Sequence, residues 1–405
     1  MAELVTFGCR LNTVESEAIR AHAAHLIDTI VVNTCAVTVQ AERDARQAIA
    51  RLHRDRPGAS IVVTGCAVQI DPARWSMLPG VTRVLGNQEK LQPGHWHSAQ
   101  SAVAPIAAAR GHTPAPLLAM QGRARAFLDV QQGCDHACTF CIIPQGRGPN
   151  RSVPVEAVAD QLRRLVGAGG QEVVLTGVDL ASWGQDLPDR PALGHLVRAL
   201  LRLVPDLSRL RLSSVDPAAL DDVFWDVLAA DHRLMPHLHL SIQAASDMVL
   251  KRMRRRHSRA GALAVIDRAR RLRPGLAIGA DLIAGFPTET DAQFGETLAF
   301  IDEARLPYLH VFPYSPRPGT PAARMPQVPP AERRARAARL RDAALTHAAA
   351  LHASLVGTDA AIVVERGGRG HTEGFAPVRL GAAAPVGSLV RRRVVAADAA
   401  GVEVA

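Results

Sequence analysis

The residues Ala126-Phe-Leu-Asp-Val130 and Cys134-Asp-His-Ala-Cys138-Thr-Phe-Cys141 decide the fold of this 405-residue chain. The first run is short and apolar, as a buried strand is, and the three thiols follow where that strand ends. Three thiolates can hold three irons of a 4Fe-4S cluster and leave the fourth iron open. The CxxxCxxC spacing therefore predicts a metal centre at the carboxyl end of a strand.

An iron with an open position has a specific chemical use. It can chelate the amino and carboxylate groups of S-adenosylmethionine (SAM), whose reduction then releases a 5′-deoxyadenosyl radical. Structural zinc is the alternative, because the same run offers three cysteines and His136 as four ligands for a tetrahedral ion. The spacing favours the cluster and leaves zinc as a second hypothesis.

Six strand-like runs, each followed by a helical pattern, begin with this strand. They are AFLDV (126–130), EVVLT (172–176), RLRLSS (209–214), HLHLSI (237–242), IGADLIAGF (278–286) and YLHVFPYS (308–315). Eight such units close a TIM barrel, so six predict a partial, open (β/α)6 barrel of the same type. Its chemistry is expected at the strand ends.

The first 98 residues repeat a pattern of apolar run, cysteine and helical stretch. LVTF precedes Cys9, TIVVN precedes Cys35, SIVVT precedes Cys66, and TRVLG (82–86) supplies a fourth strand. Strands that alternate with helices predict a parallel sheet whose strands end at one edge, where the three cysteines should converge. The alternative is that they are ordinary buried thiols.

The chain as a whole is predicted to be α/β with three domains. Residues 1–98 form the small parallel domain, 99–122 an Ala-, Pro- and Gly-rich linker, and 123–345 the partial barrel. Residues 346–405 contain short alternating runs separated by glycines, which predict a small antiparallel β-barrel. The stretch AERRARAARLRDAALTHAAALHA before these runs reads as a connecting helix.

Composition narrows the cellular setting and the partners. The chain has no apolar run long enough to cross a membrane and no signal-peptide pattern, so we expect a cytoplasmic protein without a membrane partner. Six cysteines are too few for a disulfide scaffold. The net charge is +9, and 13 arginines face 7 acidic residues between Arg317 and Ala405, which points to a polyanion at that end.

Several longer stretches carry a family resemblance. They are QGCDHACTFCIIPQGRG, VLTGVDLASWG, RLSSVDP, LHLSIQAASDMVLKRMRRRH, DLIAGFPTET and VFPYSPRPGTPAARMP. Together with the N-terminal cysteines, they resemble the radical SAM methylthiotransferases, in particular the subgroup that acts on N6-threonylcarbamoyladenosine in tRNA. The family often has glycine where this chain has Thr288, a difference that matters only if the backbone there needs a positive φ.

The resemblance implies two 4Fe-4S clusters, SAM, and a C-terminal TRAM domain that holds RNA. The implied ligands are Cys9, Cys35 and Cys66 for a cluster that carries sulfur, and Cys134, Cys138 and Cys141 for the cluster that cleaves SAM. The implied SAM contacts are Phe140, Gly177, Asp179, Ser213 and Gln243. The alternative for each of these contacts is a strand-end group that satisfies loop backbone.

Two groups of basic residues are candidates for RNA contact. The barrel-mouth group comprises Lys251, Arg252, Arg254, Arg255 and Arg256, for which a solvated helix face is the alternative. The C-terminal group comprises Arg366, Arg369, Arg379, Arg391, Arg392 and Arg393, with Phe375 the one residue there able to stack on a base. Binding through phosphates should weaken steeply with salt.

The predicted function is methylthiolation of C2 of N6-threonylcarbamoyladenosine next to the anticodon of tRNA. The predicted partners are tRNA, a flavodoxin- or ferredoxin-type electron donor and an unidentified sulfur donor, and the protein is expected to be a monomer. Sibling methylthiotransferases, acting on isopentenyladenosine in tRNA or on a ribosomal-protein aspartate, are the nearest alternatives. A zinc-containing RNA-binding protein is the non-enzymatic one, and it would be colourless.

Overall fold

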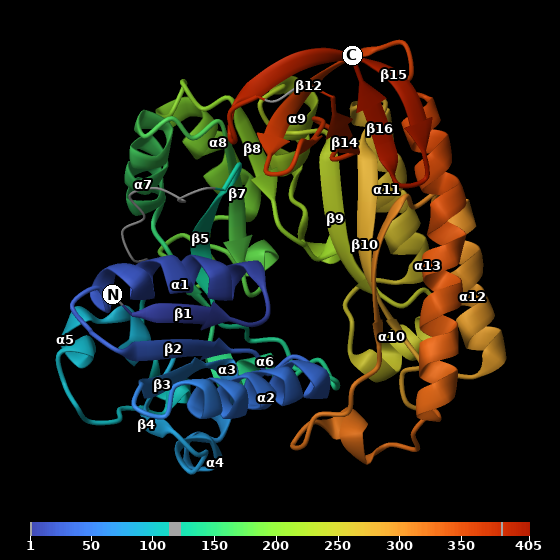
Figure 1. The fold of residues 1–405 in the computed structure, drawn as a ribbon. Helices are drawn as coiled ribbons and strands as arrows, with labels where there is room; N and C mark the ends of the chain where they lie inside the picture. Colours follow the sequence, from blue (N-terminus) through green and yellow to red (C-terminus); the bar gives the residue numbers. More distant parts are fainter. Residues whose placement is uncertain (1, 113–122, 382–383) are drawn as a thin grey trace.

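The computed structural model describes residues 2–112, 123–381 and 384–405 and has three parts (Figure 1). A small α/β domain lies beside the carboxyl ends of the barrel strands, and a small β-barrel lies at their amino ends. The α/β class is as predicted.

The N-terminal domain contains one sheet of four parallel strands in the order β1-β2-β3-β4. The strands are β1 (Glu3–Thr6), β2 (Thr29–Thr34), β3 (Ser60–Gly65) and β4 (Val81–Leu85). The helices are α1 (Arg10–His22), α2 (Val39–Asp55), α3 (Cys66–Ile70), α4 (Pro72–Ser76), η1 (Glu89–Leu91) and α5 (Pro93–Trp96). Ile30 and Val32 enter one apolar cluster and Val31 the other, so β2 is buried on both faces, which explains its unbroken apolar run.

The predicted linker is partly built into this domain. Ala102 forms a parallel bridge with Leu85, and the backbone N–H of Gly86 donates to the Ala102 carbonyl at 2.9 Å. Ile106 is buried in the short helix η2 (Ile106–Ala108). The rest of the predicted linker, residues 113–122, lies outside the described residues.

The central domain is the predicted open barrel of six parallel strands. They are β5 (Ala126–Gln132), β7 (Glu172–Gly177), β8 (Arg209–Leu212), β9 (His237–Gln243), β10 (Ala277–Ala284) and β11 (Tyr308–Pro313), and β6 (Arg151–Ser152) adds a short antiparallel edge to β5. Strands β5-β7-β8 and β9-β10-β11 form two sheets, which isolated bridges such as Val215 to Leu240 join.

Helices cover the outside of this barrel. The longer ones are α7 (Val155–Gly167), α8 (Leu193–Leu203), α9 (Asp222–Ala230), α11 (Arg259–Leu272), α12 (Asp291–Glu303) and α13 (Pro330–Ala353). The short helices α6 (Ile143–Arg147), η3 (Leu180–Ser182), η4 (Pro217–Ala219), α10 (Asp247–Met253) and η5 (Pro321–Arg324) lie instead in the segments that follow the strands. Alternate strand residues such as Leu128 and Leu240 pack outward into one large apolar core. Their neighbours, among them Phe127, His239 and Asp281, therefore face the barrel lumen, which is largely polar.

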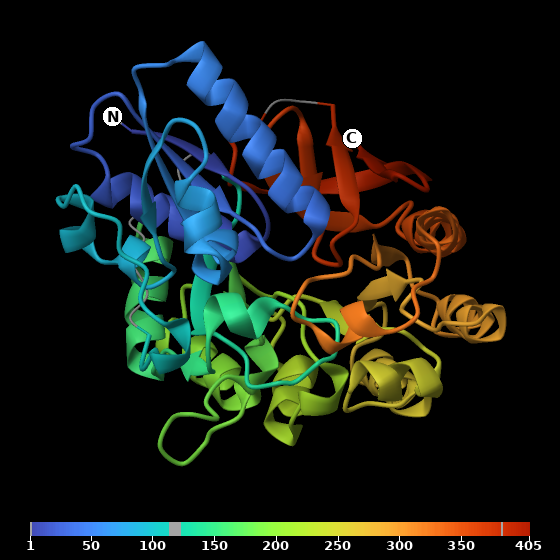
Figure 2. The ribbon, with the colours of Figure 1, turned by 90° about the horizontal axis from the view of Figure 1, so that it is seen from below.

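The N-terminal domain spans the open side of the barrel. Helix α1 packs against β5, at one edge of the opening. At the other edge, the loop after β11 contacts α2: the N–H of Val39 donates to Ser315 Oγ at 3.1 Å, and Arg317 pairs with Glu42. Figure 2 shows α2 reaching toward this loop across from the arc of barrel helices.

The C-terminal barrel is closed and has the strand order β12-β13-β14-β16-β15. Its strands are β12 (Asp359–Glu365), β13 (Arg369–His371), β14 (Pro377–Leu380), β15 (Leu389–Asp398) and β16 (Gly401–Val404). Four of its strand pairs are antiparallel as predicted, whereas β14 and β16 are parallel. The connecting helix α13 continues to Ala353, so this barrel begins several residues after the predicted boundary at 346.

The C-terminal barrel is fixed to the amino ends of the central strands by arginines. Arg211 of β8 donates to the carbonyls of Thr372 and Glu373, each at 2.9 Å, and Arg209 donates to the carbonyl of Ala361 at 2.7 Å. Phe375 stacks on His237, with ring centroids 4.8 Å apart. The predicted stacking residue for RNA is therefore engaged within the protein.

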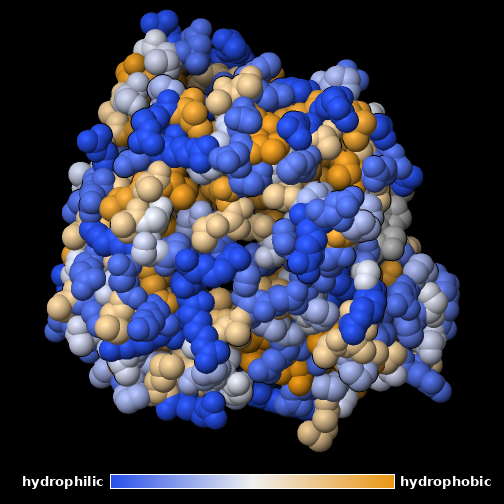
Figure 3. All heavy atoms as spheres, turned by 180° about the vertical axis from the view of Figure 1, so that it is seen from behind, coloured by the Kyte–Doolittle hydropathy of each residue, from blue (hydrophilic) through white to orange (hydrophobic). Residues whose placement is uncertain are grey.

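The face of the molecule opposite that of Figure 1 is mainly polar. On the face opposite that of Figure 1, hydrophilic side chains dominate and hydrophobic ones form small separate groups (Figure 3). Within the described ranges, none of the helices combines the length and the apolar character that crossing a bilayer requires.

Candidate functional site

The three cysteines of the CxxxCxxC run lie in a loop after β5, as predicted. Gly133 starts this loop with φ of +73°, and a Cβ there would lie 1.7 Å from the Pro149 carbonyl oxygen, so only glycine fits. Thr139 holds the far side, because its N–H donates to the Met253 carbonyl at 3.1 Å and its hydroxyl donates to the Arg252 carbonyl at 2.8 Å. The loop therefore has a fixed course across the strand ends.

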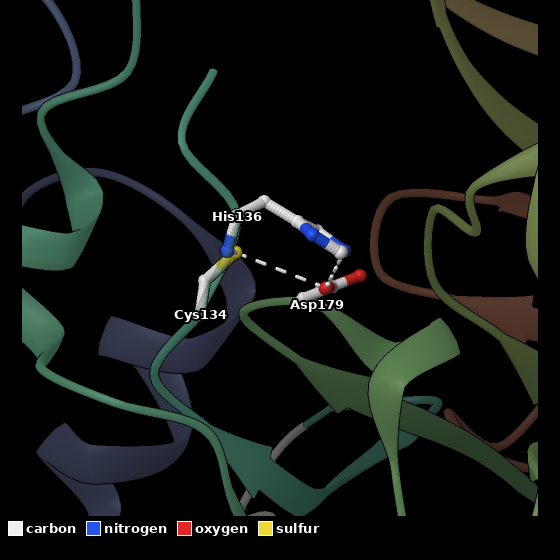
Figure 4. Close-up of side chains that lie close together, drawn as sticks. All are labelled: Cys134, His136 and Asp179. Atoms are coloured by element: carbon white, nitrogen blue, oxygen red, sulfur yellow. Dashed lines mark hydrogen bonds and ion pairs between the residues drawn. The ribbon is translucent and has the colours of Figure 1, made fainter. Parts of the chain in front are cut away.

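The geometry around these thiols does not favour a four-ligand zinc ion. Among the described residues, Cys134 lies close enough to His136 and Asp179 to share a single ion with them (Figure 4). Cys138 and Cys141 do not belong to this set. His136 Nε2 lies 2.9 Å from Asp179 Oδ2, which also accepts from the Ser182 hydroxyl at 2.6 Å. A cluster, which spreads its ligands over several irons, fits the three sulfurs better.

Two of the predicted SAM contacts lie beside the cysteine loop, where Gly177 ends β7 and Asp179 follows it. The Asp179 N–H donates to Gln131 Oε1 at 2.8 Å, and a Cβ on Gly177 would lie 2.7 Å from the same oxygen. Burial opposes ionisation of Asp179, but hydrogen bonds from His136 and Ser182 lower its pKa below the usual value. It is therefore an anion at the edge of the thiol loop.

The other predicted SAM contacts lie at the ends of neighbouring strands. Ser213 follows β8 and is buried, Gln243 ends β9, and Phe140 packs partly on the apolar cluster around Met253. Gln243 has φ of +70°, a left-handed conformation that costs energy in a non-glycine residue and is common at functional sites. These residues surround one strand-end region, and their contact with SAM stays a prediction.

Thr288 has φ of +67°. The backbone at this position therefore has the positive φ at which the difference between threonine and glycine matters. A β-branched residue is strained in this conformation. Its hydroxyl is also buried without a hydrogen-bond partner. The backbone is held there by its N–H, which donates to the Pro326 carbonyl at 3.1 Å, and by its carbonyl, which accepts from Arg252 at 3.2 Å.

The three N-terminal cysteines also lie where the prediction places them. Cys9 precedes α1, Cys35 follows β2 and Cys66 begins α3, all at the carboxyl edge of the sheet. A Cβ on Gly8 would lie 2.6 Å from Cys35 Cβ and 2.8 Å from its sulfur, so glycine lets the Cys9 segment approach Cys35. Burial raises the pKa of Cys35 to about 12, and the negative charge of Cys66 adds to the rise.

A buried charge network beside Cys66 was not predicted from the sequence. Arg147, the last residue of α6, donates from Nε to Cys66 Sγ at 3.0 Å and pairs with Glu15 of α1. Lys90 donates to the other side of Glu15 at 2.7 Å. Because α6 follows Cys141 almost directly, Arg147 connects the two cysteine sites. Neither the short helix nor an isolated arginine gave a signal of this role.

Comparison with known proteins decides the family. The Radical SAM superfamily model matches residues 128–301, and the model of Uncharacterized protein family UPF0004 matches residues 2–86. The chain is 43% identical to threonylcarbamoyladenosine tRNA methylthiotransferase MtaB of Rickettsia prowazekii (strain Madrid E), over 97% of this chain and 94% of that protein. The chain belongs to the radical SAM methylthiotransferase family.

Other members and solved structures agree with this assignment. The methylthiotransferase MtaB of Bacillus subtilis (strain 168) is 39% identical over 79% of this chain and 74% of its own length. The tRNA-2-methylthio-N(6)-dimethylallyladenosine synthase of Erythrobacter litoralis (strain HTCC2594) is 35% identical over 90% and 86%. The radical SAM methyltransferase TsrM of Kitasatospora setae shares the fold, with a TM-score of 0.54 and 15% identity over 78% and 67%.

A methylthiotransferase of this family uses SAM and 4Fe-4S clusters, and the donor sets of this chain fit them. Burial raises the pKa of Cys141 to about 11 and raises that of Cys134 as well, so these thiols need a metal to ionise at neutral pH. Guanidinium groups face one sulfur at each site: Arg147 faces Cys66, and Arg255 Nη1 lies 3.8 Å from Cys138 Sγ. A positive donor beside a sulfur suits an anionic, metal-bound thiolate.

The barrel-mouth group of this methylthiotransferase divides into inward and outward members. Arg255 and Arg256 both contact Asp216 at 3.2 Å, and Arg252 holds the Thr288 carbonyl. Lys251 and Arg254 are exposed, and Arg256 is also exposed although it reaches Asp216. Burial opposes ionisation of Asp216, but His257, whose Nδ1 lies 3.8 Å from Asp216 Oδ1, and the charge of Arg255 lower its pKa. The structure thus brings Arg255 to the thiol loop and leaves the outward members available for phosphates.

The C-terminal group divides in a similar way. Arg379 pairs with Asp398 at 3.0 Å and with Glu403 at 3.1 Å, within the barrel itself. The other five members are exposed, and in the described part of the chain no ion pair joins them to a carboxylate. They are Arg366, Arg369, Arg391, Arg392 and Arg393. Contact of either group with RNA remains a prediction.

Proposed function

We propose that this chain adds a methylthio group to C2 of N6-threonylcarbamoyladenosine next to the anticodon of tRNA. The observation that carries the proposal is that one molecule has two cysteine triads and that Arg147, which follows the barrel triad in the sequence, donates to Cys66 of the small domain. Near-full-length similarity to a relative named for this reaction supports the substrate. The product is the 2-methylthio derivative.

The chain's own residues hold and enclose the reacting groups. When bound, the cluster on Cys134, Cys138 and Cys141 supplies reductive cleavage of SAM, and the cluster on Cys9, Cys35 and Cys66 supplies sulfur. C2 of adenine has no leaving group and no acidic hydrogen, so radical chemistry suits it. The N-terminal domain spans the open side of the barrel, and the C-terminal barrel covers its amino end, which together limit the access of water.

The partners follow from the same proposal. Exposed arginines of the C-terminal barrel and Lys251 and Arg254 at the barrel mouth contact the tRNA backbone. A flavodoxin- or ferredoxin-type protein supplies electrons, and a separate donor restores the sulfur. The enzyme acts as a monomer in the cytoplasm, where its tRNA substrate is found.

A sibling acceptor is the second candidate. Several relatives are named dimethylallyladenosine synthases and are 32–35% identical to this chain. The greater identity to the threonylcarbamoyladenosine enzyme, 43%, favours that substrate. The exposed arginines favour RNA over a ribosomal-protein aspartate.

The test is nucleoside mass analysis of tRNA after anaerobic reaction with cluster-loaded protein, SAM and a strong reductant. We expect a SAM-dependent 2-methylthio product on tRNA that carries threonylcarbamoyladenosine. Product only on dimethylallyl-modified tRNA would refute the proposed substrate. A colourless protein that contains zinc in place of iron would refute the reaction class.

Cysteine variants test the two sites separately. Alanine at Cys134, Cys138 or Cys141 should abolish 5′-deoxyadenosine formation, because SAM loses its iron. Alanine at Cys9, Cys35 or Cys66 should preserve SAM cleavage and stop methylthiolation. A Cys66→Ala protein that still made product would show that sulfur comes from elsewhere.

A further inference from the structure

Arg10, the first residue of α1, lies next to Cys9 and extends toward the barrel. Its guanidinium carbon lies 5.8 Å from the ring centroid of Phe127, a lumen-facing residue of β5. Charged groups of other barrel strands act on it, notably Arg211 of β8 and Asp281 of β10. The side chain therefore enters the lumen from the side that α1 covers, beside the sulfur-carrying site.

Arg10 lies near Arg125 and Arg211 and differs from both in its lack of an anionic partner among the described residues. Arg211 pairs with Glu172 at 2.7 Å, and Arg125 pairs with Glu365 at 2.6 Å. Within residues 2–112, 123–381 and 384–405, no hydrogen bond or ion pair joins the Arg10 guanidinium to another group, and this guanidinium lies over the Phe127 ring. A partly buried cation with no counter-charge is unfavourable, so the site is suited to an anionic ligand.

The carboxylate across the lumen does not fill this role. Asp281 Oδ1 accepts from His239 Nε2 at 3.0 Å and lies 3.2 Å from His310 Nδ1. It is thus already satisfied by two imidazoles from the adjacent strands β9 and β11. Its negative charge would also repel a second carboxylate, which leaves the Arg10 side of the lumen as the place for one.

We propose that Arg10 binds the carboxylate of the threonylcarbamoyl group and thereby selects this substrate. The inference rests on the proposed function and deepens it. A guanidinium can hold a carboxylate through two parallel hydrogen bonds, which an uncharged dimethylallyl group cannot accept. Because Arg10 directly follows a ligand of the sulfur-carrying cluster, anchoring there places the modified adenine beside the sulfur source.

The test compares two anticodon stem-loop RNAs, one with threonylcarbamoyladenosine and one with its methyl ester, which lacks the charge. For the wild-type enzyme we expect kcat/KM for the acid to exceed that for the ester by about 10- to 100-fold, the size of a hydrogen-bonded charge pair. Arg10→Gln should bring the ratio close to one, and Arg10→Lys should retain part of it. Because both RNAs meet the same protein, the ratio is independent of any loss of cluster.

Arg20→Gln, on the same helix at a side chain that is 51% exposed, is the matched control and should keep the wild-type ratio. A wild-type ratio in Arg10→Gln would overturn the role of Arg10 and leave the proposed function intact. A wild-type enzyme that methylthiolates only dimethylallyl-modified RNA would overturn both.

Discussion

Glu15→Gln is expected to loosen the attachment of the N-terminal domain to the barrel. The Glu15 side chain is 1% exposed and accepts hydrogen bonds from Lys90 Nζ at 2.7 Å and from Arg147 Nη2 at 3.0 Å. Glutamine keeps the volume but removes the charge, so two buried cations lose their shared anion. Breaking a buried pair in this way costs about 3–5 kcal/mol.

The pKa of Glu15 gives a separate measure of the same interaction. Burial opposes ionisation, but the charges of Arg147 and Lys90 lower the pKa from 4.5 to about 2. At 1.36 kcal/mol for each pKa unit, the ionised carboxylate contributes roughly 3 kcal/mol. Because the folded pKa is the lower one, this stability is present above about pH 4.5 and is lost as the pH falls toward 2.

The assay is urea unfolding of the cluster-loaded protein under anaerobic conditions, followed by circular dichroism and by iron absorbance. Glu17→Gln is the control, because it makes the same change on the same helix in an ion pair with the exposed Arg20, at 3.5 Å. The control should cost about 0–1 kcal/mol. If Glu15→Gln cost no more than Glu17→Gln, or if the protein kept its full stability at pH 3, the reasoning would be wrong.

Two further substitutions test other features of the structure. Thr288→Gly should stabilise the fold by about 1 kcal/mol, because it relieves the strain of the positive φ and removes an unpaired hydroxyl. Thr290→Ala should instead destabilise the fold by about 1 kcal/mol, because it removes the side chain that caps α12. Thermal unfolding measures both effects. Replacing Arg391, Arg392 and Arg393 together by Gln should reduce the slope of log tRNA affinity against log salt concentration by about 2–3. Arg379→Gln should reduce this slope less, because Arg379 is paired with Asp398. An unchanged slope in the triple variant would exclude this strand from the tRNA interface.

The strands and the cysteines could be predicted because their signals are local. Runs such as TIVVN and SIVVT have an apolar Ile-Val-Val centre, and a cysteine stands two residues after the end of each. Parallel strands share one carboxyl edge, so the meeting of Cys9, Cys35 and Cys66 followed from topology alone. The six-strand barrel was predicted on the same grounds.

The Glu15–Lys90–Arg147 network could not be predicted, because its members are far apart in the sequence. Arg147 and Glu15 are separated by 132 residues and meet only when two domains dock. The basic residues at 251–257 are neighbours in the sequence, but their composition does not show which side chains face the protein and which face solvent. Arg255 contacts Asp216 and Cys138, whereas Lys251 is exposed. The parallel pairing of β14 with β16 likewise depends on how the small barrel closes.

The two cysteine sites differ in how much they depend on this docking. The loop of Cys134, Cys138 and Cys141 is held by barrel residues, among them Met253 and Asp179. Cys66, in contrast, receives a hydrogen bond from Arg147, which belongs to the barrel and is oriented by Glu15 of the small domain. Glu15→Gln should therefore reduce methylthiolation more than it reduces 5′-deoxyadenosine formation. Equal loss of both activities would mean that the domains do not support their sites independently.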